Sequence, residues 1–389
     1  MYGLLAMNAK ILRPLAVYVH IPFCRAKCLY CSFASRPAGP STQAEYIERL
    51  ILEMDRYFAS NPGWSVDTIY VGGGTPSMMS VSDIRHLMVA LTRLAPKAVE
   101  ITCESNPHPD DVGKLQVLRD LGVNRISVGV QSFDDSELGL AGRLHTSSDA
   151  ERFLEACRNA GFDNLSIDLI HGLPNQSLES FRKSLSRAVE FGPEHLSLYG
   201  LSVDPESRLG RLPERLVAGL RIPDGDSQAD MYDFARHYLA DAGYRQYEIS
   251  NFARPRFECK HNLVYWSGID YIGFGPGAAS FIDGVRFRRI SDVDSYLSAQ
   301  RQGRNTVEYL ENLSSERAAA EALVLGLRRS TGVDRKTFET RFGIKLTDLC
   351  GEAIERHREA GLLEVNDDNI RLSERAYFIS NAVFRDFII

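Results

Sequence analysis

Short apolar runs rich in β-branched and aromatic residues recur along the first 200 residues, and longer amphipathic segments separate them. This alternation predicts repeated strand–helix units, in which each helix returns the chain to start the next parallel strand. Six such units predict an α/β fold, an open and partial version of the eight-unit TIM barrel. The predicted strands are Leu15–Ile21, Thr68–Gly72, Val99–Glu104, Arg125–Val130, Leu165–Ile170 and His195–Gly200.

Apolar positions at helical spacing, preceded by capping residues, predict the helices between these strands. They are Thr42–Phe58 with Ser41 as N-cap, Ser82–Leu94, Ser147–Ala160 and Ser177–Phe191. One more helix, Asp226–Ala242, is expected after the sixth strand.

The pattern changes from about Leu313 onward, where helical stretches precede an apparent hairpin and a closing helix. Helices followed by a two-stranded wing resemble a small winged-helix-like α+β domain, which we expect to pack on the barrel or to meet a partner. The predicted elements are helices Ser315–Arg329, Asp334–Phe342 and Leu346–Ala360, a turn at Asn366–Asn369 and a helix at Tyr377–Phe387. We therefore divide the chain into an amino-terminal lead (1–14), the barrel (15–225), a barrel extension (226–312) and a carboxyl-terminal domain (313–389).

Composition narrows the class of protein. The chain is 44% hydrophobic and 25% charged, with a formal net charge of −6, so its charge gives no footing for nucleic-acid binding. No apolar run approaches the roughly 20 residues needed to span a bilayer. Residues 1–13 lack the long apolar core and the cleavage site of an export signal. We expect a cytoplasmic protein.

Three cysteines follow the first predicted strand with the spacing C-x3-C-x2-C, at Cys24, Cys28 and Cys31. The chain has seven cysteines, and this odd, scattered set favours a reducing compartment over a disulfide framework. Because an iron–sulfur cube normally takes four cysteines, a set of three leaves one iron open to a small molecule. A tetrahedral zinc site that uses His20 as its fourth ligand is the alternative that the spacing leaves open.

Polar residues collect after the other predicted strands, where barrel folds keep their ligand sites. Glycine in the run 72–74 lets the backbone approach a ligand closely, although a plain strand-to-helix turn explains the same run. The remaining strand-end residues are Glu104, Asn106, Gln131, Asp168 and His171.

The cysteine spacing, with Tyr30 directly before the last cysteine, resembles the signature of the radical S-adenosylmethionine (SAM) superfamily. This resemblance implies a [4Fe-4S] cluster on Cys24, Cys28 and Cys31, whose open iron chelates the amino and carboxylate groups of SAM. An electron, from a donor such as flavodoxin or ferredoxin, then cleaves the sulfonium and yields methionine and a 5'-deoxyadenosyl radical. The protein must bind, orient and shield this chemistry.

Further residues look like the SAM contacts of the oxygen-independent coproporphyrinogen oxidase-like branch of that superfamily. The resemblance implies that the GGTP segment meets the SAM amino group, that carboxylates meet ribose hydroxyls and that an arginine meets the methionyl carboxylate. Each residue taken singly also fits an ordinary strand-end polar residue. The implied contacts are Tyr18, Gly73, Gly74, Thr75, Glu104, Gln131, Arg143 and Asp168.

The segment from Cys259 to Trp266 brings a histidine, a thiol and two large aromatics within reach of one flat ligand. Imidazole is a normal axial donor to haem iron, and aromatic faces stack on macrocycles. The pattern H-N-x-x-Y-W resembles the signature of the radical SAM haem chaperones, the HemW family. This resemblance implies haem as a ligand, with His261 as the first choice for its axial ligand and Cys259 as a weaker one. The alternative is that His261 is an ordinary structural histidine that packs beside a core tryptophan.

A basic loop between Asp204 and Asp226 carries four arginines. Guanidinium groups pair well with carboxylates such as haem propionates, but a charged loop usually only faces water. Both interpretations stay open. The arginines are Arg208, Arg211, Arg215 and Arg221.

Two departures argue against the sister family, the coproporphyrinogen III dehydrogenases. Phe33 stands where that family has a fourth cysteine, and only about a dozen residues precede the first strand. The resemblance therefore implies haem delivery to an acceptor haemoprotein, in relatives a respiratory one, with SAM cleavage permitted. A porphyrin-directed or methyl-transferring radical SAM enzyme and a haem carrier with a structural cluster are the alternatives. Dimerisation is left open.

Overall fold

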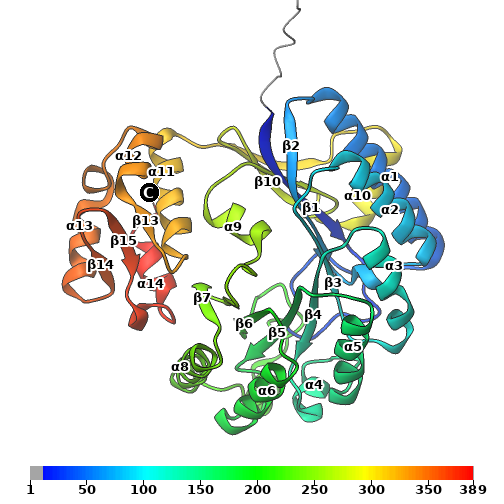
Figure 1. The fold of residues 1–389 in the computed structure, drawn as a ribbon, viewed down its shortest axis with the longest axis horizontal. Coiled ribbons are helices and arrows are strands. Elements are labelled where there is room, and N and C mark those ends of the chain that lie inside the picture. The colour runs from blue at the N-terminus through cyan, green and yellow to red at the C-terminus, as the bar shows by residue number, and fades with distance from the viewer. Residues whose placement is uncertain (1–11, 389) are drawn as a thin grey trace, which may run out of the picture.

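A computed structural model describes residues 12–388 of the chain. Six parallel strands lie side by side in chain order and curve into a partial barrel, which is the fold class that the sequence predicts (Figure 1). The parallel strands are β1 (Arg13–Ile21), β2 (Trp64–Gly73), β3 (Glu100–Ser105), β4 (Arg125–Gln131), β5 (Leu165–His171) and β6 (His195–Gly200).

Helices cover the outer face of this sheet and bury apolar side chains against it in one continuous core (Figure 1). The first helix corrects one prediction, because it begins at Pro40 with Gly39 as N-cap, and Ser41 is not its cap. Proline suits a first helical position, since its φ is preset and its missing N–H would have no partner there. The covering helices are α1 (Pro40–Ser60), α2 (Val81–Leu94), α3 (Leu115–Asp120), α4 (Asp135–Leu140), α5 (Ser147–Asn159), α6 (Leu178–Glu190) and α8 (Gly225–Asp241).

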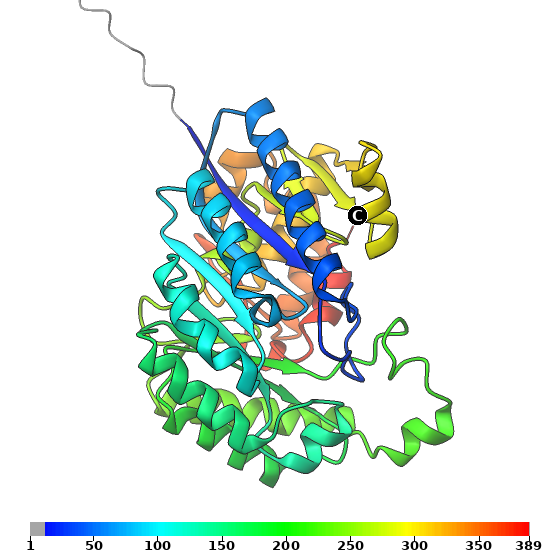
Figure 2. The same cartoon turned by 90° about the vertical axis from the view of Figure 1, so that its right-hand side faces the viewer.

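The segment after α8 extends the curved sheet at both edges. A short helix, α9 (Lys260–Trp266), lies inside the curve of the sheet against β2, with α11 as its other neighbour (Figure 1). The added strands are β7 (Arg245–Glu248) and β8 (Asn251–Ala253) beyond β6, and β9 (Tyr271–Phe274), β10 (Ala279–Ile282), β11 (Val285–Arg289) and β12 (Val307–Asn312) beyond β1. Two more helices are α7 (Glu214–Gly219), in the loop that projects from the barrel in Figure 2, and α10 (Val293–Arg301).

The last part of the chain forms three helices, a small antiparallel sheet and a closing helix around a second hydrophobic core. The closing helix is shorter than predicted and begins at Ser380 rather than Tyr377. Tyr377 instead ends the short 3-10 turn Glu374–Ala376, and its N–H donates to the Glu374 carbonyl. The elements are α11 (Ser315–Leu327), β13 (Val333–Asp334), α12 (Arg335–Phe342), α13 (Leu346–Glu359), β14 (Leu363–Val365), β15 (Asn369–Leu372) and α14 (Ser380–Arg385).

Among the described residues, no helix is both long enough and apolar enough to cross a membrane. The predicted amino-terminal lead, residues 1–14, falls almost entirely outside the described residues.

Candidate cluster and ligand site

A cavity of about 430 Å³ opens at the carboxyl ends of the parallel strands. The loop after β1 forms one wall, and the ends of β2 to β6 form the rest. Most of the site residues predicted from the sequence meet here, as expected for a barrel. They are Cys24, Cys28, Cys31, Gly73, Gly74, Glu104, Gln131, Arg143 and Asp168.

The three cysteines are partly buried, and each carries a free thiol. Arg143 Nη1 lies 3.3 Å from Cys28 Sγ, and Thr75 Oγ1 lies 3.6 Å from Cys24 Sγ. In the described part of the chain, no three Cys, His, Asp or Glu side chains converge tightly enough to hold a single metal ion. A four-iron cluster does not require such convergence, because each cysteine binds a different iron.

His20, the fourth ligand of the zinc alternative, is already engaged. Its Nε2 lies 2.8 Å from the Ala34 carbonyl, and its Nδ1 lies 2.8 Å from the Tyr18 hydroxyl. Since a carbonyl only accepts, Nε2 donates and Nδ1 accepts from Tyr18. The structure therefore disfavours zinc on His20. Tyr18, a predicted SAM contact, lies in the barrel wall and does not line the cavity.

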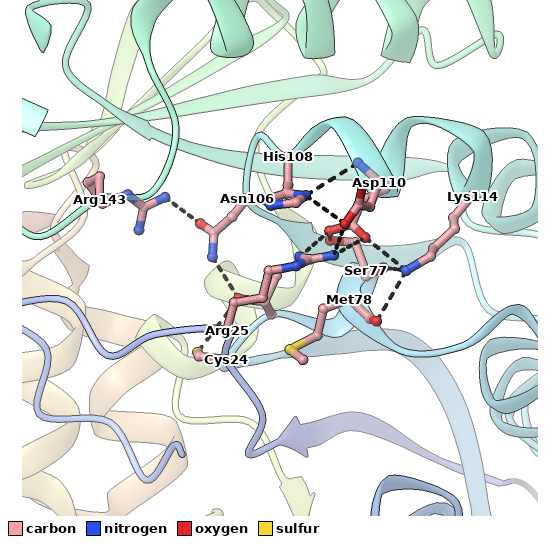
Figure 3. A network of polar contacts seen from close by, with 11 residues as sticks. Cys24, Arg25, Ser77, Met78, Asn106, His108, Asp110, Lys114 and Arg143 are labelled. Atoms are coloured by element: carbon pink, nitrogen blue, oxygen red, sulfur yellow. Dashed lines mark hydrogen bonds and ion pairs between the residues drawn. The ribbon is translucent and has the colours of Figure 1, made fainter. Parts of the chain in front are cut away.

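A buried carboxylate ties the cysteine loop to the segment after β3 (Figure 3). The Asp111 side chain has no exposed surface, and it accepts hydrogen bonds from both terminal nitrogens of Arg25, at 2.7 and 2.8 Å. Lys114 Nζ adds a third contact at 2.8 Å. Arg25 stands between Cys24 and Cys28, so this ion-pair network fixes the loop that carries the cysteines. Nothing in the sequence pattern indicates it, because the partners lie 86 positions apart.

A second chain of hydrogen bonds crosses the cavity wall (Figure 3). Arg143 Nη2 donates to Asn106 Oδ1 at 2.6 Å, and Asn106 Nδ2 donates to Thr75 Oγ1 at 2.7 Å. The buried Nε of Arg143 has no partner among residues 12–388. A guanidinium N–H left over beside the cavity fits an anionic ligand group such as a carboxylate.

Two carboxylates present acceptor oxygens to the cavity. Glu104 accepts from the Tyr70 hydroxyl at 2.8 Å and from the Gly73 N–H at 2.9 Å, and burial raises its pKa to about 6. Asp168 accepts from Ser127 Oγ at 3.1 Å, and burial raises its pKa as well. Both are suited to accept hydrogen bonds from ligand hydroxyls. Sequence reasoning missed Tyr70, although it precedes Gly72 by two positions on the same strand face.

The glycine run 72–74 lets the backbone at the end of β1 approach closely. A Cβ on Gly74 would lie 2.8 Å from the Ile21 carbonyl oxygen and closer still to that of Phe23. Its N–H donates to Ile21 at 2.8 Å. The run therefore packs against the start of the cysteine loop, besides lining the cavity. Gln131, on the opposite wall, has a φ of 69°, a strained conformation of the kind that clusters at ligand sites.

His261 lies away from the cavity and is fully buried in α9. Its Nδ1 lies 2.9 Å from Thr68 Oγ1, and its Nε2 lies 2.8 Å from the Tyr265 hydroxyl. Glu100 accepts the backbone N–H of His261 at 3.0 Å and lies 3.4 Å from the buried Cys259 Sγ. The structure thus does not bring the predicted haem ligand to the other site residues, and both its ring nitrogens have protein partners.

The arginine-bearing loop docks on the cysteine loop. The Leu209 N–H donates to the Leu29 carbonyl at 2.8 Å, and Arg208 Nη1 donates to the Lys27 carbonyl at 3.2 Å. Arg211 pairs with Glu206 at 2.6 Å. This loop therefore supports the cluster region from outside the barrel.

Known proteins resemble this chain over most of its length. Residues 18–188 match the family model of the Radical SAM superfamily, and residues 313–379 match the HemN C-terminal domain. Heme chaperone HemW of Lactococcus lactis is 35% identical over 97% of this chain and 98% of its own length. The chain belongs to the HemW family. The Bacillus subtilis HemW is 34% identical over 96% of this chain and 99% of its own length.

The fold of this HemW-family chain also matches that of coproporphyrinogen III oxidase (HemN) from Escherichia coli. The TM-score is 0.83 at 24% identity, over 98% of this chain and 91% of that one. Membership of the radical SAM superfamily implies a [4Fe-4S] cluster and SAM.

Proposed function

We propose that this protein is a haem chaperone, which binds haem and delivers it to an acceptor haemoprotein. The observation that carries the proposal is the extent of the likeness. Relatives named heme chaperone match 97% of the chain at 35% identity, a span that takes in the barrel, α9 and the carboxyl-terminal domain.

The cavity residues fit the cofactors of the superfamily. When bound, the cluster supplies the electron that cleaves the sulfonium of SAM. Cys24, Cys28 and Cys31 would hold the cluster, and Arg143 would hold the methionyl carboxylate of SAM through its unpaired Nε. Glu104, Gln131 and Asp168 would orient the nucleoside, and Gly73 and Gly74 would face the amino group of SAM. Thr75 does not line the cavity, and it would support this turn through its contacts with Asn106 and Cys24.

Phe33 bears on the choice between chaperone and enzyme. It is 64% exposed and lines the cavity where the decarboxylating family has a further cysteine. An exposed ring at this position suits contact with a flat apolar ligand better than metal binding. A coproporphyrinogen III oxidase or a class C-type methyltransferase is the second candidate, on the strength of the HemN-like fold.

Haem ligation by His261 stays a prediction, and it requires a change in the hydrogen bonds of the His261 ring. Both hydrogen bonds of the ring, to Thr68 and Tyr265, must break before iron reaches a nitrogen. The other partners are also proposals: a respiratory, membrane-associated acceptor, an electron donor such as flavodoxin or ferredoxin, and a second copy of this chain. We also propose a cytoplasmic location and a division of the chain into a barrel (15–225), a barrel extension (226–312) and a carboxyl-terminal domain (313–389).

An anaerobic haem titration of the cluster-reconstituted protein, followed by absorbance, tests the proposal. Saturable binding near one haem per chain supports it, and a triple variant with Cys24, Cys28 and Cys31 each changed to Ala asks whether the cluster is needed. Absence of saturable binding rejects the chaperone. In that event, incubation with dithionite, SAM and coproporphyrinogen III distinguishes the two enzymes, because only decarboxylation releases carbon dioxide and only methyl transfer adds a methyl group.

A further inference from the structure

A line of hydrogen bonds joins two of the three candidate cluster cysteines through side chains that follow α4, β3 and β2 (Figure 3). Arg143 Nη1 lies 3.3 Å from Cys28 Sγ, and Arg143 Nη2 donates to Asn106 Oδ1 at 2.6 Å. Asn106 Nδ2 donates to Thr75 Oγ1 at 2.7 Å, and Thr75 Oγ1 lies 3.6 Å from Cys24 Sγ. We call Arg143, Asn106 and Thr75 the cysteine clamp.

The direction of each hydrogen bond in the cysteine clamp follows from the groups that can only donate. A guanidinium has no acceptor, so the Asn106 atom that faces Arg143 is the amide oxygen. The amide nitrogen therefore faces Thr75 and donates to it. Because the Thr75 oxygen accepts this hydrogen bond, its own hydrogen is left for Cys24 Sγ. Both ends of the cysteine clamp thus donate to sulfur.

The surrounding backbone holds the cysteine clamp in place. Thr75 is buried, and its N–H donates to the Phe23 carbonyl at 2.8 Å, directly before the first cysteine. Arg143 Nη2 also donates to the Gly129 carbonyl at 2.6 Å. A Cβ on Gly129 would lie 2.7 Å from Asn106 Oδ1, so glycine leaves room for the amide. The donors are therefore already in position beside the cysteine sulfurs.

Donors in this position favour the reduced form of an iron–sulfur cluster. Reduction adds one electron, and its negative charge spreads over the irons and the sulfurs that bind them. Hydrogen bonds to the sulfurs and net charge are among the factors that set the reduction potential. The guanidinium of Arg143 brings a positive charge and a hydrogen bond to Cys28, and the Thr75 hydroxyl brings a hydrogen bond to Cys24.

We propose that the cysteine clamp raises the reduction potential of the [4Fe-4S] cluster, and that Asn106 directs the Thr75 hydrogen to Cys24. This inference rests on the proposed three-cysteine cluster and does not depend on haem binding. Asn106 makes no hydrogen bond to either sulfur, so it is a positioning residue that acts through Thr75 and Arg143. The step concerned is the uptake of one electron by the cluster, with no bond formed or broken.

Asn106→Asp gives the sharpest test, because it keeps the shape of the side chain and changes the direction of one hydrogen bond. A carboxylate at position 106 still accepts from Arg143 but cannot donate to Thr75, so the Thr75 hydroxyl is expected to turn away from Cys24. The lost donor and the added negative charge both disfavour reduction. At a fixed potential, the ratio of reduced to oxidised cluster should fall at least about tenfold, which is about 59 mV for one electron.

A redox titration with dithionite measures this ratio in the full-length, cluster-reconstituted protein without SAM. The electron paramagnetic resonance signal of the reduced cluster is the readout. Asn124→Asp is the matched control, since it makes the same chemical change at the opposite ends of β3 and β4. Asn124 Nδ2 donates to the Val99 carbonyl at 3.1 Å, and this variant should keep the wild-type potential.

Two changes at Thr75 separate the hydrogen bond from the added charge. Thr75→Val keeps the shape and removes the hydroxyl, so the ratio of reduced to oxidised cluster should fall about tenfold. Thr75→Ser keeps the hydroxyl and should restore a potential near that of the wild type. In the Thr75→Val background, Asn106→Asp should lower the ratio less than in the wild type, because no hydrogen is left to redirect.

The outcomes separate the cysteine clamp from the cluster itself. Unchanged potentials in Asn106→Asp and Thr75→Val overturn the clamp and leave the three-cysteine cluster standing. An equal effect of Asn106→Asp in both backgrounds overturns the role of Asn106. Failure of the wild type to assemble a reducible four-iron cluster, judged by iron content, overturns both proposals. If Thr75→Val loses its cluster, retention in Thr75→Ser supports the hydroxyl contact, and loss in both variants overturns it.

Discussion

The ion-pair network of Asp111 yields a prediction with a built-in control. Asp111→Asn keeps the size of the side chain and removes its charge. The variant leaves Arg25 and Lys114 facing a neutral amide where the wild type has a fully buried carboxylate at 2.7 to 2.8 Å (Figure 3).

The exposure of Arg25 and Lys114 determines how much the free energy of unfolding should fall. Breaking a buried ion pair from one side typically costs about 3–5 kcal/mol, since a charge is left unpaired. The side chains of Arg25 and Lys114 are 24% and 15% exposed, so both regain some hydration in the variant. We therefore expect the free energy of unfolding to fall by about 2–3 kcal/mol, below the full value. Because Arg25 stands between Cys24 and Cys28, we also expect a chelator to remove iron faster from the reconstituted variant.

Urea denaturation midpoints and the rate of iron release to a chelator check both expectations. Asp110→Asn is the matched control, since Asp110 is the neighbouring residue, is 75% exposed and lies 4.0 Å from Arg25. It should change the free energy of unfolding by less than about 0.5 kcal/mol. Equal midpoints and equal iron release in the two variants would refute the assignment of Asp111 as the anchor of the cysteine loop.

Three further predictions concern the cavity and α9. Folding raises the pKa of Glu104 from 4.5 to about 6, so the folded protein holds this proton more tightly than the unfolded chain does. The stability of the folded protein should therefore fall by about 2 kcal/mol in total as pH rises from well below 4.5 to well above 6, and Glu104→Gln should remove that slope in a plot of Tm against pH. Gly74→Ala should displace the GGTP turn and weaken SAM binding at least tenfold by calorimetry, whereas Gly139→Ala, where a Cβ meets nothing within 4 Å, should bind SAM as the wild type does. His261→Ala should lower the free energy of unfolding by about 2–4 kcal/mol, because it leaves a cavity and two unpaired hydroxyls. The exposed His237→Ala should change it by less than about 0.5 kcal/mol in the same urea titration.

The fold was predictable because its pattern is local and repeated. Each of the six strands is an apolar run bounded by turn residues, and the structure places all six in the expected order. The predicted start of α1 was wrong, because Ser41 has the chemistry of an N-cap but the helix already begins at Pro40. The predicted start of α14 was wrong because Tyr377 closes the 3-10 turn Glu374–Ala376, and the helix begins only at Ser380.

The site was predictable where it follows from strand ends and from the cysteine spacing. Glu104, Gln131 and Asp168 all line the cavity, because parallel strands bring their carboxyl ends to one edge. The residues that position them were not predictable. Asp111 and Tyr70 act through contacts with residues 86 and 34 positions away, and no local pattern carries that information.

The motif in α9 did not reveal the structural role of this helix in the barrel. A barrel of only six parallel strands leaves an open side and exposes polar groups inside, among them Thr68 and Glu100 on neighbouring strands. α9 covers these groups, since His261 pairs with Thr68 and its backbone N–H pairs with Glu100.

The same segment is linked to the cavity. The Tyr70 ring lies 5.2 Å from that of His261, and its hydroxyl holds Glu104 at 2.8 Å. One histidine motif thus closes the barrel and supports the site at the same time. Loss of haem binding in a His261 variant would therefore identify a ligand only if urea midpoints and the pH slope of Glu104 stayed unchanged.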